Sequence, residues 1–165
     1  MSVPYQTIDT RWGTRNSHRL GQGNTLPYTG VPFGMNHFVL ETRPGEPRFF
    51  HPEDGTAFGI RLTHQPSPWM GDFAWVTWQV ACLTDKEWNQ LKSPLSAEAS
   101  RELASSGYRG DLAQFRPGFL SYQRLRDGLQ VACCPTRDGA SLKVTPNRRY
   151  PKGHWIMSLI LDQSG

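Results

Sequence analysis

The sequence contains little cysteine, and its cysteines do not form a recognisable metal or redox motif. There are three in 165 residues, and two of them, Cys133 and Cys134, are adjacent. Three thiols cannot all pair, and adjacent cysteines lack the C-x-x-C spacing of zinc and redox sites, so a disulfide framework is excluded. The first residues have neither a basic start nor an apolar core, so no export signal is visible. Together these features predict a cytoplasmic protein.

Other common features are also missing. No apolar run approaches the roughly 20 residues of a membrane-spanning helix, which predicts no membrane partner. The net charge is +4, but apart from Arg148, Arg149 and Lys152 the basic residues are scattered, which predicts no nucleic-acid partner. The five histidines include no pair at zinc spacing, and there is no G-x-S-x-G elbow or phosphate-binding glycine loop.

Turn-forming residues and short alternating segments are abundant. The chain has 16 glycines and 13 prolines, and its length suits one domain with a real core. Seven short segments have the composition or alternation of strands. They are residues 37–40, 57–62, 73–80, 119–125, 129–134, 141–145 and 155–161. This pattern predicts a mainly β protein, an antiparallel β-sandwich with one or two short helices.

Local signals place the turns and helices of this sandwich. Asp127-Gly128 between two strand segments is a strong hairpin signal. Thr84 and Glu87 have the spacing of a capping box, which predicts a helix that ends before Pro94. The Ala-rich residues 96–106 predict a second helix, closed by Gly107 as the residue after its C-cap.

Two stretches, residues 23–35 and 62–73, combine proline and glycine with aromatic and hydrogen-bonding side chains. Proline fixes φ and glycine reaches positive φ, so such a mixture specifies a shaped loop. Aromatic rings held on shaped loops beside Asn, His and Asp provide a flat apolar face and aimed polar groups. This combination is typical of a sugar-binding site.

The second stretch supplies three candidate sugar-binding residues. Trp69 offers a stacking face, although a loop aromatic also serves as an anchor on the sandwich, and both roles stay open. Asp72 is a charged acceptor for sugar hydroxyls, and its alternative role is to cap its own turn. His64 can donate to a hydroxyl or orient a neighbour, but a lone histidine is often structural.

The first stretch supplies the other three. Phe33 can form the apolar floor of a pocket or belong to the core. Asn24 and Thr25 can bind ligand hydroxyls or shape the turn that contains them. Trp75 and Trp155, in contrast, fall at strand spacing and are predicted to be core residues.

Taken together, residues 8–14, 24–35 and 63–73 resemble the amino-terminal domain of glycoside hydrolase family 92, the calcium-dependent exo-acting α-mannosidases. The resemblance implies a β-sandwich followed by a large helical barrel, and residues 1–165 have room for the sandwich only. It further implies that the inverting acid and base, and most calcium ligands, lie in the barrel. No catalytic residue or metal ligand is therefore assigned to this chain, and its partners are mannose-containing glycans and a C-terminal barrel domain.

This resemblance predicts the sugar-contacting domain of an α-mannosidase that is inactive alone and present as a partial protein. A free-standing carbohydrate-binding module is the leading alternative. A third possibility is a self-contained enzyme that uses Asp72 with either Asp54 or Glu41 as its carboxylate pair. Ligand binding and an activity assay on the chain discriminate among the three.

Overall fold

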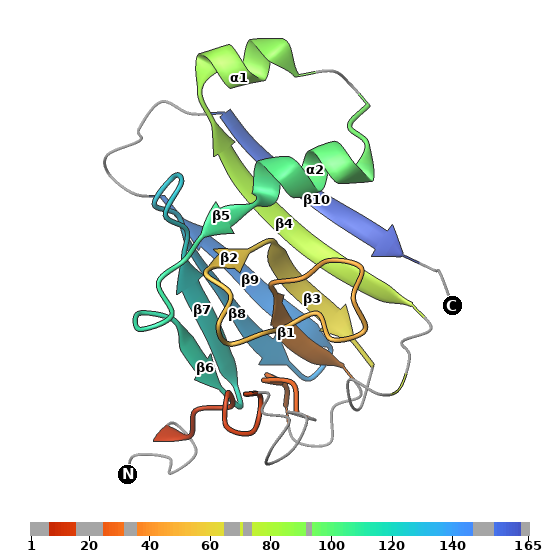
Figure 1. Ribbon diagram of the computed structural model, residues 1–165, viewed down its shortest axis with the longest axis vertical. Helices are drawn as coiled ribbons and strands as arrows, with labels where there is room; N and C mark the ends of the chain where they lie inside the picture. Colours follow the sequence, from red (N-terminus) through yellow and green to blue (C-terminus); the bar gives the residue numbers. More distant parts are fainter. Residues whose placement is uncertain are drawn as a thin grey trace.

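The computed structural model describes residues 7–15, 25–31, 36–64, 70, 74–91, 94–146 and 154–162. Antiparallel strands are the main secondary structure of these residues, and two short helices interrupt them (Figure 1). The seven strand segments expected from the alternation of the sequence all correspond to strands of the structure. The predicted mainly β fold class is therefore confirmed.

Two four-stranded antiparallel sheets make up the sandwich. The first has the order β1-β3-β4-β10 and consists of β1 (His37–Glu41), β3 (Gly59–Thr63), β4 (Trp75–Leu83) and β10 (His154–Asp162). The second has the order β6-β7-β8-β9 and consists of β6 (Gln114–Arg116), β7 (Phe119–Gln123), β8 (Gln130–Thr136) and β9 (Gly139–Thr145). A small ribbon joins β2 (Thr56–Ala57) to β5 (Ser106–Gly107).

The core lies between the two sheets. Strand residues alternate between faces, so the register places Leu40 beside Ile60, and Ile60 beside Trp78, on the inner face of the first sheet. Residues of both sheets belong to one buried cluster: Phe38, Leu40, Ile60 and Val80 from the first, and Phe115, Leu120, Tyr122, Val131 and Cys133 from the second. The apolar surface that they remove from water is the main stabilising contribution to the fold.

Polar and charged side chains fill the opposite face of the first sheet. Glu41 and Arg61 are each 2% exposed, and Arg61 Nη1 lies 3.5 Å from Glu41 Oε1. The Arg61 guanidinium is held between the rings of Phe49 and Trp75, 4.0 Å from each ring centroid. Such a charge persists in a core only where it is paired or stacked, and Arg61 is both.

The two helices cover one end of this face. Helix α1 (Asp85–Gln90) starts at the predicted capping box, in which Thr84 and Glu87 satisfy each other's backbone amides. Helix α2 (Ala97–Ala104) lies over β4 and β10, and its Ser100 hydroxyl is 3.2 Å from Gln79 Oε1 and 2.6 Å from Ser158 Oγ (Figure 1). Among the described residues, no helix is long and apolar enough to cross a membrane.

Two local expectations were wrong. Helix α2 ends at Ala104 with Ser105 as its C-cap, and Gly107 instead pairs with Thr56 in the β2–β5 ribbon. Trp155 is 42% exposed because it lies on the edge strand β10. It begins an apolar row whose other members, Met157, Leu159 and Leu161, are 69%, 65% and 70% exposed. Alternation identified the strand but not its place at the edge.

Gly59, at the start of β3, lies where the backbone of β4 approaches closely. A Cβ atom at this position would lie 2.4 Å from the Trp78 carbonyl oxygen, which belongs to a backbone fixed by sheet hydrogen bonds. We expect Gly59→Ala to lower the free energy of unfolding by roughly 1–3 kcal/mol or more, because the strands must separate to admit the methyl group. Chemical denaturation monitored by tryptophan fluorescence measures the change.

Gly118→Ala is the matched control for Gly59→Ala. Gly118 lies in the turn between β6 and β7, and a Cβ atom there meets no heavy atom within 4 Å. The free energy of unfolding of the Gly118→Ala variant is expected to stay within about 0.5 kcal/mol of that of the parent protein, or to rise slightly. Equal losses in the two variants would contradict the close approach of β3 and β4.

Candidate functional site

Residues 25–31 connect the two sheets at one end of the sandwich. The Thr29 amide donates to the Phe38 carbonyl at 2.9 Å, and the Phe38 amide donates back to Thr29 at 2.8 Å, so the segment pairs with β1. On its other side the Thr29 hydroxyl donates to the Arg116 carbonyl at 2.9 Å, and the Gly30 amide donates to the Pro117 carbonyl at 2.7 Å. The segment is thus fixed to both sheets.

Polar and aromatic side chains gather where β1 begins and β3 ends. His37 is the register partner of Thr63, so the residues that flank these strands meet at the same end of the sheet. His64 Nε2 lies 2.8 Å from Asn36 Oδ1, and this pair is exposed to solvent. The His37 ring packs against the Tyr28 ring, with 4.8 Å between centroids and 44° between planes.

The environment of His37 favours its neutral form. Burial lowers the pKa of His37, and the nearby charge of His64 lowers it further. A neutral imidazole has one donor and one acceptor nitrogen, so it can orient a hydroxyl group without carrying charge. Gly30 allows this packing because a Cβ atom there would lie 3.3 Å from His37 Nδ1 and from the Asn36 carbonyl oxygen.

Thr25 holds a neighbouring turn in place. Its hydroxyl donates to the Gly13 carbonyl at 2.9 Å, and its side chain is exposed. Gly13 has φ of +82°, a conformation that favours glycine, and a Cβ atom there would lie 2.6 Å from Thr25 Oγ1. The Thr25 hydroxyl therefore supports the turn at Gly13, and both its sugar-binding role and its role in the turn that contains it stay predictions.

The structure places two of the six sequence-predicted binding residues, and the other four lie outside the described residues. His64 and Thr25 both lie at this end of the sandwich, on neighbouring segments with different partners. The other four are Asn24, Phe33, Trp69 and Asp72. In the sequence, Asn24 directly precedes residues 25–31, and Phe33 falls between residue 31 and residue 36. Trp69 and Asp72 fall between β3 and β4. Their sugar-binding roles stay predictions.

Sequence reasoning missed three members of the cluster. Tyr28 stood within the shaped first stretch, and its position between Pro27 and Gly30 was a usable signal. His37 is predicted only as the first residue of a strand and as one of the histidines without zinc spacing, and no sequence pattern singles out Asn36. Only the register between β1 and β3 brings them beside His64.

Two of the three carboxylates of the self-contained-enzyme hypothesis, Glu41 and Asp54, are engaged in ion pairs, and the third, Asp72, lies outside the described residues. Glu41 is buried against Arg61, and its pKa is raised by burial. Asp54 accepts from Arg43 Nε at 2.8 Å and Nη2 at 3.0 Å, and the contacts with Arg43 and Thr42 outweigh burial and lower its pKa. Neither is therefore a free, solvent-facing partner for a water molecule or a leaving group.

No metal centre is visible in the part of the chain that the structure describes. Within it, no group of three or more His, Cys, Asp or Glu side chains could hold an ion. Calcium prefers six to eight oxygen ligands, several of them carboxylates. The described residues therefore do not fit the requirements of a calcium site.

Comparison with known proteins gives one family and a set of similar structures. The family model described as the glycosyl hydrolase family 92 N-terminal domain matches residues 7–159. No curated protein matches the chain. Among solved structures, the chain is similar to a family GH92 inverting mannosidase from Bacteroides thetaiotaomicron VPI-5482, with a TM-score of 0.72 and 24% identity over 94% of this chain.

A second solved structure gives the same result. A family GH92 α-mannosidase from Bacteroides thetaiotaomicron has a TM-score of 0.61 and is 18% identical over 84% of this chain. The chain spans only 19% and 18% of the lengths of these two proteins. At this identity the structural likeness establishes the fold.

Proposed function

This chain belongs to the family of glycosyl hydrolase family 92 N-terminal domains, and from that premise we propose that it forms the sugar-contacting wall of an exo-acting α-mannosidase. The observation that carries the proposal is the cluster of Tyr28, Asn36, His37 and His64 at one end of the sandwich. Its members combine an aromatic face with hydrogen-bond donors and acceptors, which is the chemistry that a sugar ring requires.

Each member of the cluster has a definite task in this proposal. Asn36 holds the His64 ring because its amide oxygen accepts from Nε2, which leaves Nδ1 of the neutral ring as an acceptor. His37, kept neutral by burial, offers a hydrogen bond without attracting an ion. The Tyr28 ring supports His37 and provides apolar surface for C–H groups of the sugar. The chain thus binds and orients the terminal mannose.

The hydrolytic chemistry is assigned to a different part of a complete enzyme. An inverting glycosidase needs a carboxylic acid and a carboxylate base roughly 6.5–9.5 Å apart, on opposite sides of the sugar. Glu41 and Asp54 are engaged with arginines and do not fit these roles. We therefore place acid, base and calcium in the C-terminal helical barrel that the family resemblance implies, outside the described residues.

Two measurements on the chain alone test this proposal. We expect no hydrolysis of an aryl α-mannoside above the buffer rate, with or without calcium. We expect weak binding of methyl α-mannoside, with a dissociation constant above about 1 mM, because only one wall of the pocket is present. In an NMR titration, the amide signals of residues 28–30, 36–37 and 64 should shift, and His64→Ala should abolish these shifts.

His154→Ala is the matched control for His64→Ala. His154 also bonds a polar side chain, with Nε2 at 2.9 Å from Asp85 Oδ1, but it lies on β10 beside α1. The His154→Ala variant should show the same amide shifts with methyl α-mannoside as the parent chain. Micromolar binding of methyl α-mannoside would instead show that the chain is a free-standing carbohydrate-binding module. Turnover of the aryl α-mannoside by the chain would instead favour the self-contained enzyme.

A further inference from the structure

Residues 42–55 form the loop that connects β1 to β2, and Figure 1 shows this loop crossing over β1 and β3. Two neighbouring aromatic residues of the loop are buried in different places. The Phe49 ring stacks on the Arg61 guanidinium on the polar face of the first sheet. The Phe50 ring belongs to the core between the sheets and packs against Phe115 of β6, with 5.6 Å between the ring centroids. The loop therefore covers a buried charge and also completes the core.

His51 closes this loop through its backbone and its ring. The His51 amide donates to the Thr42 hydroxyl at 2.9 Å, and the Asp54 amide donates to the His51 carbonyl at 3.2 Å. In the ring, Nε2 lies 3.3 Å from Arg43 Nη1. An arginine side chain has donors only and keeps its charge in proteins, so His51 Nε2 accepts this hydrogen bond. His51 is therefore neutral in the closed loop, with its proton on Nδ1.

The charged groups that act on His51 all belong to the same loop. Burial lowers the pKa of His51, and the charges of Arg43 and Arg48 lower it further, whereas Asp54 and Glu46 oppose this fall without cancelling it. Asp54 is already engaged, because it accepts from Arg43 Nε at 2.8 Å and from Nη2 at 3.0 Å. Glu46 lies 3.8 Å from the same guanidinium. A proton on His51 removes the acceptor of Arg43 and places a second positive charge beside it.

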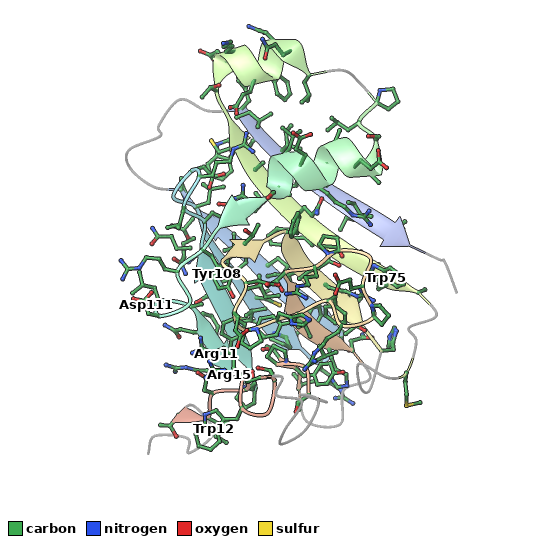
Figure 2. All side chains as sticks on the ribbon, viewed as in Figure 1. Arg11, Trp12, Arg15, Trp75, Tyr108 and Asp111 are labelled. Carbon is green, nitrogen blue, oxygen red and sulfur yellow. The ribbon has the colours of Figure 1, made fainter. Side chains whose placement is uncertain are left out.

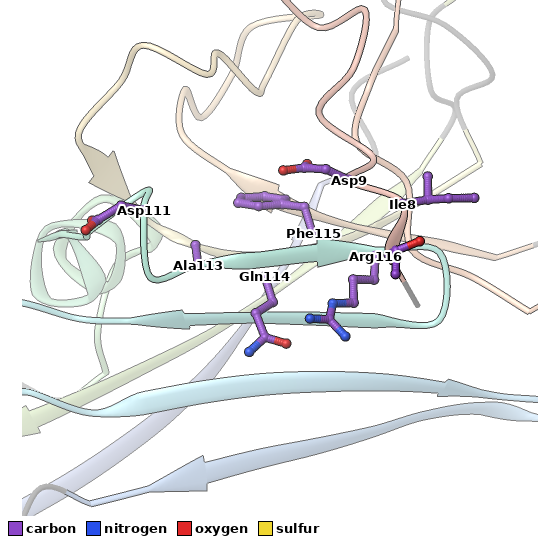
Figure 3. Close-up of a pocket in the computed structure, with 8 residues that line it drawn as sticks. Ile8, Asp9, Asp111, Ala113, Gln114, Phe115 and Arg116 are labelled. Atoms are coloured by element: carbon purple, nitrogen blue, oxygen red, sulfur yellow. The ribbon is translucent and has the colours of Figure 1, made fainter. Parts of the chain in front are cut away.

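The N-terminal segment, residues 7–15, is attached to this loop. Arg48 Nη2 donates to the carbonyl of the buried Thr14 at 3.2 Å. Arg15, at the lower end of the molecule in Figure 2, pairs with Glu53 at 3.1 Å and so brings no unbalanced charge to the loop. The same segment borders β6 across a groove of about 620 Å³ (Figure 3). The loop thus connects the first sheet to a segment that lies along the second.

We propose that His51 makes residues 42–55 an acid-sensitive latch: a proton on its ring breaks the hydrogen bond with Arg43 and opens the loop. Opening withdraws Phe49 from Arg61 and releases Thr14 from Arg48. The direction follows from linkage. Because the pKa of His51 is lowered in the closed loop, the stabilisation by its neutral ring is complete above the open-loop pKa and is lost as the pH falls through the closed-loop pKa.

The test is amide hydrogen exchange of the isotope-labelled chain, measured by NMR near pH 7.5 and near pH 5, the range in which histidine titrates. The reporter amides are those of Thr42 and Arg43, which donate to the Phe49 carbonyl at 2.8 Å and 2.9 Å. Their protection factors, which correct for the effect of pH on intrinsic exchange, should fall roughly threefold or more at the lower pH. The amides of Tyr122 and Val131, register partners in the second sheet, should keep their protection.

His51→Gln removes the titrating group but keeps an acceptor, because a glutamine carbonyl can accept from Arg43. In this variant the protection of the Thr42 and Arg43 amides should be the same at both pH values. His154→Gln is the matched control. His154 Nε2 also bonds a side chain, at 2.9 Å from Asp85 Oδ1, but it lies on β10, at the opposite edge of the first sheet from β1. This variant should keep the pH dependence of the parent chain.

An NMR titration of the His51 ring in the parent chain gives a second readout that needs no variant. Its pKa should lie below 6.5, the ordinary value for histidine. A pKa at or above 6.5, or a pH dependence that survives in His51→Gln, would overturn the latch. So would loop protection that does not change with pH. An equal fall at the loop and at Tyr122 and Val131 would also overturn it, because acid would then unfold the whole domain.

Discussion

Replacing Asp127 by alanine is expected to lower the free energy of unfolding by about 3–5 kcal/mol, because it leaves a buried guanidinium without its counter-charge. The Arg124 and Asp127 side chains are 1% and 4% exposed. The carboxylate accepts from Arg124 Nε at 3.0 Å and from the backbone amides of Cys82 at 3.1 Å and Leu129 at 3.3 Å. Arg124 also donates to the Ala104 carbonyl at the end of α2.

A loss of this size is a large part of the roughly 5–15 kcal/mol by which a domain is stable. It corresponds to a fall in Tm of roughly 6–20 °C for a chain of this length. Thermal unfolding by circular dichroism measures it. Asp111→Ala is the control, because Asp111 also pairs with a nearby arginine but is 63% exposed, and its loss should leave the melting temperature almost unchanged. Similar losses in both variants would show that burial of the Arg124–Asp127 pair has no special role.

The second large effect is expected for Arg61→Met, and it should depend on pH. Burial raises the pKa of Glu41 above its ordinary value, and the charge of Arg61 opposes that rise. When the pKa of a carboxyl group is higher in the folded than in the unfolded state, its ionisation destabilises the fold. The free energy of unfolding therefore falls as the pH rises from the unfolded-state pKa through the folded-state pKa. Without Arg61 the pKa of Glu41 rises further. The variant should therefore lose little stability near pH 5 and about 3–5 kcal/mol near pH 8.

Urea denaturation at the two pH values measures this difference. Arg109→Met removes an arginine that is 56% exposed and should show a small loss at both. The double variant Glu41→Leu, Arg61→Met should recover most of the stability at pH 8, since an apolar pair replaces a buried ion pair without an unpaired charge. A loss in Arg61→Met that is equal at pH 5 and pH 8 would show that Glu41 does not titrate in this range.

Local sequence signals predicted most of the elements of this fold. Alternation gave the strands, Asp127-Gly128 gave the turn between β7 and β8, and Thr84 with Glu87 gave the start of α1. These signals succeed because they depend on side chains a few residues apart. The end of α2 was misplaced because Gly107 follows the helix in sequence but belongs to the β2–β5 ribbon, which forms through a distant contact.

The candidate site was predicted less completely. The sequence directed attention to His64 and Thr25 through the composition of their loops, but not to Tyr28, Asn36 and His37. These three residues come close to His64 only through the pairing of β1 with β3 and of Thr29 with Phe38. A histidine at the start of a strand has no distinguishing local pattern. Only the register of the sheet brings His37 to the same end as His64.

The sequence by itself therefore determined the class of fold, the positions of strands and caps, and the loops in which a sugar site was expected. Periodicity, turn chemistry and capping act over short distances along the chain, so a sequence pattern contains them. The tertiary structure alone decided which residues lie side by side. It placed Arg61 between two rings, exposed Trp155 at a sheet edge and opened a groove between Asp9 and β6. Those outcomes depend on contacts between segments far apart in sequence, where packing, burial and charge pairing act together and leave no local pattern.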